Sequence, residues 1–450
     1  MMNVNTNPKE EQKTSNKNRR PGAAAFLSLI SIGLGQIYNG ELVKGLLLKL
    51  IVCLGVSLFV LSNYLSSHTL LFLSAFLIVF VSLKVYSTIQ AYRKSRKLGP
   101  FYTLRTFNRS YVYVLLTVLF LALSMILPIL IARTALMNIS GHHPFRSVKA
   151  KELYLHTYDK RAKEWPVLSE TRMIDTAFGQ TFVRISGPVD APPLVLLPGA
   201  GGPSLLWIPN IEALAESHRV YAVDNIYDFG RSIFTRKVKT PVDFMSWLDE
   251  LFTTLELGNN INLMGLSYGG WLTSQYALHH PERLDKAVLV APASTVVPLS
   301  SEWAFRSLLC LVPHRHFTNK MMLWLLEDLV NNDRKGQQIL DAVVDNAFLG
   351  LQCFKPKMLV NPTVLTDEEL RSIKVPTLYL VGENEKIYSP QVAVKRLKQI
   401  APQIRVELIP NAGHDLTVVQ ADMVNEKVLE FINSNDDQKE PHNNYEALNK

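Results

Sequence analysis

Residues 264–270 read MGLSYGG, a serine-centred heptapeptide that follows a short apolar run and precedes a stretch of helical character at 271–278. A serine flanked by glycines between a strand and a helix is typical of the sharp turn that exposes a nucleophile. Gly265 and Gly269 leave room for the backbone to pass close by. Ser267 is therefore a candidate nucleophile, although ordinary loops also contain this glycine pattern.

Apolar runs and amphipathic stretches alternate on both sides of this turn. Short continuous apolar runs occur at 193–197, 219–223, 261–264, 286–290, 376–381 and 404–409. Such runs are typical of strands buried on both faces of a parallel sheet. Between them, residues 241–257 repeat apolar side chains every three or four positions, as a helix does. Residues 172–177 and 181–186 indicate a hairpin. The sequence predicts an α/β fold, with a doubly wound, mostly parallel sheet between helices.

A histidine and two glutamates follow the serine in an order that suits catalysis. His414 lies in NAGHD, directly after the last predicted strand, and the turn GENE at 382–385 closes the strand before it. Active sites of open α/β sheets gather at the carboxyl ends of strands. The sequence therefore predicts Ser267 as nucleophile, His414 as base and Glu385 as the acid that orients the histidine. Glu383 stays the alternative acid.

An oxyanion-binding site requires backbone N–H donors near the serine. One is expected from Tyr268, directly after the nucleophile, and the other from Ala200 in the turn PGAGG at 198–202. A glycine-rich turn also occurs in phosphate-binding loops, but this one lacks their Lys-Ser/Thr ending.

These motifs together make residues 170–433 resemble the α/β-hydrolase-fold proteins, in the style of bacterial carboxylesterases. The matching pieces are DNIYDFGRS at 224–232, GLSYGG at 265–270, HHPERL at 279–284, GENE at 382–385 and NAGH at 411–414. The resemblance implies a helical lid between about 293 and 372, and ester hydrolysis through an acyl-enzyme without metal or organic cofactor. Two departures, Pro198 in place of the usual histidine and glutamate in place of aspartate, are not expected to abolish the chemistry.

Two other classes of function stay open. The acyl-enzyme of an acyltransferase passes its acyl group to an alcohol rather than to water, and the sequence does not separate these acceptors. A catalytically silent binding module attached to a membrane is the second alternative, which an intact triad disfavours. The expected partner is a small-molecule or lipid-like ester, together with membrane lipid, and the oligomeric state is undetermined.

The N-terminal part of the 450-residue chain carries most of the excess in its 48% apolar content. Apolar segments occur at 23–38, 45–65, 69–91 and 111–132, and the last three are long enough to cross a bilayer. The net charge of +8 arises from 47 basic and 39 acidic side chains. Because the basic residues cluster beside these segments, they suit cytoplasmic flanks of membrane helices better than a nucleic-acid partner.

Charge bias also predicts a topology for this region. With the basic tail and the loop 93–109 both cytoplasmic, 23–38 is a short interfacial or re-entrant segment and the hydrolase-like half lies on the extracytoplasmic side. However, GLGQIYNG at 33–40 resembles the turn of small bacterial two-helix membrane modules, which implies that 23–38 crosses. The side of the membrane therefore stays open.

The predicted division of the chain has five parts. They are a disordered basic tail (1–20), a transmembrane helical region (21–135), a linker with one helix (136–170), the hydrolase-like domain (171–433) and a disordered tail (434–450). Cys53, Cys310 and Cys353 indicate no disulfide framework, although a single bridge is compatible with them. His142 and His143 lack further ligands at metal-binding spacing, which favours a solvated linker.

Overall fold

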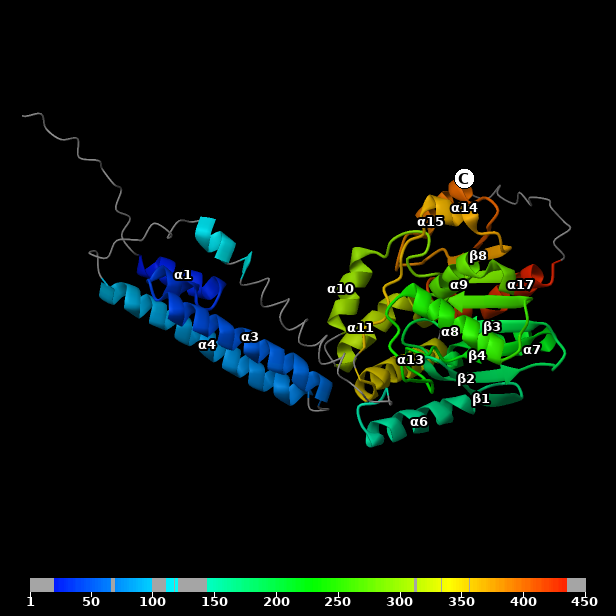
Figure 1. Ribbon diagram of the computed structural model, residues 1–450, viewed down its shortest axis with the longest axis horizontal. Helices are drawn as coiled ribbons and strands as arrows, with labels where there is room; N and C mark the ends of the chain where they lie inside the picture. The colour runs from blue at the N-terminus through cyan, green and yellow to red at the C-terminus, as the bar shows by residue number, and fades with distance from the viewer. Residues whose placement is uncertain are drawn as a thin grey trace, which may run out of the picture. The chain divides into compact units, whose positions relative to one another are not determined.

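The chain forms two compact units, Met1–Ser140 and Gly141–Lys450. The computed structural model (Figure 1) describes residues 20–65, 69–98, 111–116, 118–119, 144–310, 314–332, 334–355 and 357–434. The two predicted tails lie outside these residues except for Arg20 and Ser434, and so do His142 and His143. The three cysteines are free thiols, so they form no disulfide.

Unit 1 consists of helices in its described part. They include α1 (Pro21–Ile30), α2 (Leu34–Tyr38), α3 (Leu42–Leu65) and α4 (Thr69–Leu98), and residues 111–116 and 118–119 are also helical. Residues 23–38 form two helices rather than one because Gly33 turns the chain with a φ of 100°. A Cβ added at Gly33 would collide with the backbone oxygen of Gly45. Glycine at both positions therefore permits the close packing of this turn.

Buried polar groups join α2 to α4. Gln36 is fully buried, and its Nε2 donates to the backbone oxygen of Ser87 and to Oε1 of Gln90, each at 2.8 Å. Nδ2 of Asn39 donates to the backbone oxygen of Ala91 at 2.7 Å. Because buried amides are costly without partners, these bonds fix the position of α2 on α4.

The prediction of a transmembrane region finds no support in the described part of unit 1. No helix there is both long enough and apolar enough to cross a membrane. Segments 45–65 and 69–91 lie within α3 and α4, whereas most of 111–132 lies outside the described residues.

Unit 2 is built on a single nine-stranded sheet with the order β1-β2-β4-β3-β6-β7-β8-β9, and β5 pairs with β2. The strands are β1 (Ser169–Thr176), β2 (Gly179–Ser186), β3 (Pro193–Leu197), β4 (Arg219–Val223), β5 (Ile233–Phe234), β6 (Ile261–Leu266), β7 (Leu284–Val290), β8 (Thr377–Gly382) and β9 (Arg405–Ile409). β1, β2 and β4 pair antiparallel, and the pairs from β4 to β9 are parallel. The predicted mostly parallel α/β sheet is therefore confirmed.

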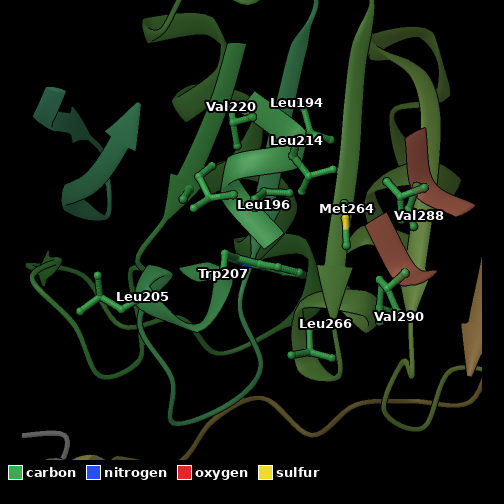
Figure 2. Close-up of a cluster of buried hydrophobic side chains, with 14 of the residues drawn as sticks. Leu194, Leu196, Leu205, Trp207, Leu214, Val220, Met264, Leu266, Val288 and Val290 are labelled. Carbon is green, nitrogen blue, oxygen red and sulfur yellow. The ribbon is translucent and has the colours of Figure 1, made fainter. Parts of the chain in front are cut away.

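Alternate residues of the central strands pack on opposite faces of the sheet. Leu194 and Leu196 of β3 join one hydrophobic cluster, shown in Figure 2, whereas Val195 and Leu197 join another. Helices α6 (Val148–Ala162), α7 (Ile208–Ser217) and α17 (Ala421–Ile432) pack in the first cluster. Helices α8 (Pro241–Thr254) and α9 (Tyr268–His279) cover the other face, which α15 (Pro390–Ile400) extends at β7 and β8. Burial on both faces explains the continuous apolar runs.

Helix α6 lies in the range 136–170, for which the sequence predicts a linker with one helix. Its Tyr154 and Tyr158 are each only 1% exposed, and both belong to the core cluster of unit 2. The Tyr158 hydroxyl donates to Oδ1 of Asp224 at 3.3 Å. The helix is therefore an integral layer of unit 2.

A helical insertion separates β7 from β8, where the sequence predicts a lid over 293–372. Its helices are α10 (Ser301–Leu309), α11 (Arg315–Leu325), α12 (Glu327–Asn332), α13 (Arg334–Cys353) and α14 (Asp367–Ser372). α10 exposes the large apolar side chains of Phe305 and Leu308.

Two fully buried tryptophans of unit 2 differ in whether the indole N–H has a hydrogen-bond partner, which allows the contribution of that bond to be tested. Nε1 of Trp247 donates to Oγ1 of Thr181 at 2.8 Å, whereas Nε1 of Trp207 has no partner among the described residues. Trp247→Phe would leave a buried hydroxyl unpaired. We expect it to lower the free energy of unfolding by about 1–3 kcal/mol more than Trp207→Phe does. Urea denaturation of the full chain measures both, and equal losses would contradict the expectation.

Candidate active site

Ser267 occupies a strained turn between β6 and α9. Its φ of 54° and ψ of −111° are unusual for a residue with a side chain. Its N–H donates to the backbone oxygen of Val290 at 2.8 Å, and its own backbone oxygen accepts from Ala293 at 3.0 Å. A Cβ added at Gly265 would collide with the backbone oxygen of Gly269. Glycine at these positions lets the chain turn tightly enough to hold the serine at the end of the strand.

His414 and Glu385 meet beside the carboxyl ends of β8 and β9. Nδ1 of His414 lies 2.8 Å from Oε2 of Glu385, and the glutamate side chain is fully buried. The other carboxylate oxygen, Oε1, accepts the backbone N–H groups of Lys386 at 2.9 Å and Ile387 at 3.0 Å. The carboxylate is therefore fixed in position, and it faces the imidazole with one oxygen only.

The neighbouring Glu383 has a different environment. Its side chain is exposed, and its backbone N–H donates to the backbone oxygen of Ile409 at 3.0 Å. The N–H of Asn384 donates to the backbone oxygen of Ala412 at 2.9 Å. These bonds join the turn that carries the acid to the turn that carries the histidine. Of the two predicted acids, Glu385 is the one in contact with His414.

The glycine-rich turn after β3 lies beside the serine. A Cβ added at Gly199 would lie 3.4 Å from Cβ of Ser267. Ala200 is exposed in this turn, and Tyr268 is the first residue of α9. N–H groups in the first turn of a helix lack acceptors within the helix, so the Tyr268 N–H is available to a ligand. Both predicted oxyanion donors therefore belong to segments that adjoin Ser267.

The Ser267 hydroxyl and His414 form no hydrogen bond within the described residues. In structures without substrate, catalytic hydrogen bonds are often long or poorly aligned and tighten when substrate binds. The two side chains nevertheless come from turns at the same edge of the sheet, since β6 and β9 run parallel to the strands between them.

Two buried aspartates hold the glycine-rich turn. Oδ2 of Asp228 accepts the N–H of Gly201 at 2.8 Å, and Oδ1 of Asp224 accepts the N–H of Ser204 at 2.7 Å. Burial raises the pKa of both carboxyl groups, and these hydrogen bonds oppose the rise. The DNIYDFGRS motif identified these aspartates as part of the family resemblance. It did not indicate that they hold the glycine-rich turn through hydrogen bonds.

The insertion contacts the turns that carry Glu385 and His414 through the start of α12. Oδ2 of Asp415 accepts the N–H of Leu329 at 2.8 Å, and Nδ2 of Asn384 donates to Oδ1 of Asp328 at 3.0 Å. Lys386 forms an ion pair with Glu327. These contacts join positions more than fifty residues apart, so no local sequence pattern could reveal them.

The pKa of His414 is raised above its usual value. Burial disfavours the charged imidazolium, but the charge and hydrogen bond of Glu385, with a smaller effect from Asp415, more than offset that cost. A histidine with this environment becomes a stronger base and keeps an orienting partner on Nδ1. The described residues contain no cluster of side chains that could hold a metal ion.

Comparison with known proteins identifies a family that this chain matches. The profile of the family described as "alpha/beta hydrolase fold" matches residues 192–419. The "Uncharacterized carboxylesterase nap" of Bacillus subtilis is 37% identical over 288 residues, which are 62% of this chain and 92% of that protein. "Carboxylesterase YbfK" of the same species is 34% identical over 288 residues, 64% of this chain and 96% of that one.

A solved structure supports the same fold. The crystal structure of naproxen esterase (carboxylesterase NP) from Bacillus subtilis superposes with a TM-score of 0.57 and 37% sequence identity. The match covers 62% of this chain and 97% of that chain. Unit 1 lies outside the region that the family profile matches.

Proposed function

This chain belongs to the alpha/beta hydrolase fold family and is an esterase-type hydrolase, and from that premise we propose that it cleaves carboxylic esters with Ser267, His414 and Glu385. The observation that carries the proposal is the 2.8 Å contact between Nδ1 of His414 and the buried Glu385, at the same sheet edge as the strained Ser267. An imidazole held in this way by a buried carboxylate leaves Nε2 as the proton acceptor.

In the proposed reaction, Nε2 of His414 takes the proton of the Ser267 hydroxyl while the oxygen attacks the ester carbonyl. The N–H groups of Ala200 and Tyr268 receive the developing oxyanion. His414 then gives its proton to the leaving alcohol, and an acyl-enzyme on Ser267 remains. Water attacks this ester with the same histidine as base, which releases the acid and restores the serine. Glu385 stabilises the imidazolium in each half of the cycle.

The test of this proposal uses the purified full chain and p-nitrophenyl esters of increasing acyl length. Hydrolysis, together with covalent labelling of Ser267 by an alkyl phosphonate located by mass spectrometry, would support the proposal. Added alcohol distinguishes an acyltransferase, because ester exchange would then exceed release of free acid. Labelling at another serine, or no turnover of any ester, would overturn the proposal that Ser267 is the nucleophile of an esterase. The carboxylesterase names of the relatives favour hydrolysis over a silent binding module.

The pH dependence follows from the raised pKa of His414. The reaction requires the neutral imidazole, so activity is lost as the pH falls through the pKa of this group. Because that pKa is raised, we expect the acid limb of kcat/KM to lie above the ordinary histidine value of about 6.5. A pH–rate profile measures it. The acid limb of the Glu383→Gln variant serves as control. A wild-type acid limb below the ordinary histidine pKa would contradict the assignment of His414 as the base.

Attachment to membrane lipid through unit 1 is a further part of the proposal. It is supported by large apolar side chains that are exposed on its helices, including Phe26, Leu29, Val43, Leu47, Ile51, Ile78, Val79 and Val85. Basic side chains at the end of α4, such as Arg93 and Arg96, suit anionic headgroups. Flotation of the full chain with anionic lipid vesicles tests this, and a Val43→Asp, Leu47→Asp variant should float less.

The side of the membrane is proposed from the charge bias of the sequence, which favours an extracytoplasmic hydrolase domain. Protease treatment of intact cells, followed by detection of a tag at the C-terminus, tests the placement. Loss of the tag in intact cells supports it, and protection until the cells are lysed would assign the domain to the cytoplasm.

A further inference from the structure

Lys357 is a buried cation with no role in the reaction described above. It lies between α13 and α14, in a segment without regular structure. Its Nζ is buried and has no hydrogen-bond partner among the described residues. Four aromatic rings surround it, with centroids 5.1–5.9 Å from Nζ: those of Tyr227, Phe229, Phe234 and Phe354. An ammonium group removed from water in this way requires a compensating interaction.

Part of the compensation comes from the rings, whose faces attract a cation electrostatically, and more strongly when the cation is removed from water. Asp228 supplies an opposite charge that favours the charged form of Lys357. Burial lowers the pKa of Lys357 to about 8, and the charge of Asp228 opposes this. In return, the lysine counteracts the rise that burial causes in the pKa of Asp228.

Asp228 in turn connects to the turn beside Ser267. It is 4% exposed, its Oδ1 accepts the N–H of Phe229 at 2.8 Å, and its Oδ2 accepts the N–H of Gly201 at 2.8 Å. Gly201 follows Ala200 directly and has a φ of 77°. The hydrogen bond from its N–H to Asp228 therefore helps to hold the backbone conformation of the turn. A charged acceptor makes a shorter and stronger hydrogen bond than a neutral one.

The same segment is also fixed to the nucleophile helix. The Tyr268 hydroxyl donates to the backbone oxygen of Val360 at 2.8 Å, three residues after Lys357. Gly202 closes the turn with an N–H bond of 3.1 Å to the backbone oxygen of Gly199. Lys357 therefore approaches the oxyanion site from the insertion, on a segment that already contacts the helix after Ser267.

We infer that Lys357 is a positioning residue: its ammonium group lies among the rings of Tyr227 and Phe229 that flank Asp228 and supports this carboxylate electrostatically, and Asp228 holds Gly201 so that the turn presents the Ala200 N–H to the oxyanion. The inference rests on the proposed function for its effect on turnover, but its effect on the turn itself is independent of that function. A donor displaced by about 1 Å can cost up to 100-fold in rate. The lysine touches neither substrate nor the reacting atoms.

The test compares Lys357→Met, Asp228→Asn and the double variant in the full chain. With a short ester, Lys357→Met is expected to lower kcat by roughly tenfold to 100-fold, while KM changes by less than about threefold. If the lysine acts through Asp228, the double variant is no less active than Asp228→Asn alone. The exposed Lys374→Met serves as control and should retain wild-type kcat.

A second readout separates this inference from the proposed function. Amide hydrogen exchange of a peptide covering 198–203 should be faster in Lys357→Met than in wild type, with the strands of the sheet unchanged. Wild-type protein without esterase activity would overturn the proposed function, and the exchange rates would still decide the role of Lys357. Unchanged exchange, or losses in kcat that multiply in the double variant, would overturn the inference.

Discussion

Ser267→Ala is expected to lower kcat for ester hydrolysis on the order of 10⁶-fold, because removal of the nucleophile leaves only binding and oxyanion stabilisation. The fold should persist, since alanine removes only the hydroxyl oxygen of a half-buried residue and keeps the Cβ that the turn already accommodates. Steady-state turnover of a p-nitrophenyl ester measures the loss, and circular dichroism with thermal unfolding verifies the fold.

Ser294→Ala is the matched control for this variant. Ser294 also has a positive φ, of 50°, and it is 7% exposed, so the two substitutions make similar demands on the backbone. We expect Ser294→Ala to retain wild-type turnover. A Ser267→Ala protein that keeps more than about one per cent of wild-type kcat would show that another group is the nucleophile.

Glu385→Gln is expected to lower kcat by about 10⁴-fold although it changes a single atom. The backbone N–H groups of Lys386 and Ile387 already donate to Oε1 of the carboxylate. A glutamine must keep its carbonyl oxygen toward these donors, and its NH₂ group then faces Nδ1 of His414. The imidazole accepts that hydrogen bond and carries its proton on Nε2. In this tautomer it cannot take the proton of Ser267.

Glu383→Gln provides the comparison, because this glutamate lies two positions earlier on the same turn and is exposed. Its turnover should match wild type within about twofold, as surface substitutions usually have small effects. Steady-state kinetics of the two variants in parallel measure the difference. If Glu383→Gln were the slower enzyme, the acid would be assigned to the wrong residue.

The central sheet was predictable because its signals are local. The runs at 193–197 and 219–223 coincide with β3 and β4, since a strand buried on both faces must be apolar throughout. The turn around Ser267 was predictable for a similar reason, because glycines at two nearby positions indicate that backbone atoms approach each other closely there. Both features depend on residues within a few positions of each other.

Features that depend on distant contacts escaped prediction. Periodicity revealed α6, but its burial depends on partners such as Asp224, more than sixty residues away. The turn at 382–385 contains two acids, and Glu385, which the sequence favoured, is the one in contact with His414. Lys357 lies in a segment without periodicity, so the sequence contained no signal for its aromatic surroundings. The transmembrane prediction rests on the apolar content of segments 45–65, 69–91 and 111–132, and no helix among the described residues supports it.

The contacts of α12 give the helical insertion a direct link to the turns that carry the proposed histidine and acid. Leu329 is bonded to Asp415, next to the histidine, while Asp328 is bonded to Asn384, next to the acid. An acyl group bulky enough to displace α12 would therefore pull on both turns at once. Selectivity among esters would then appear in turnover as well as in affinity, so that a poorly fitting substrate is bound yet processed slowly.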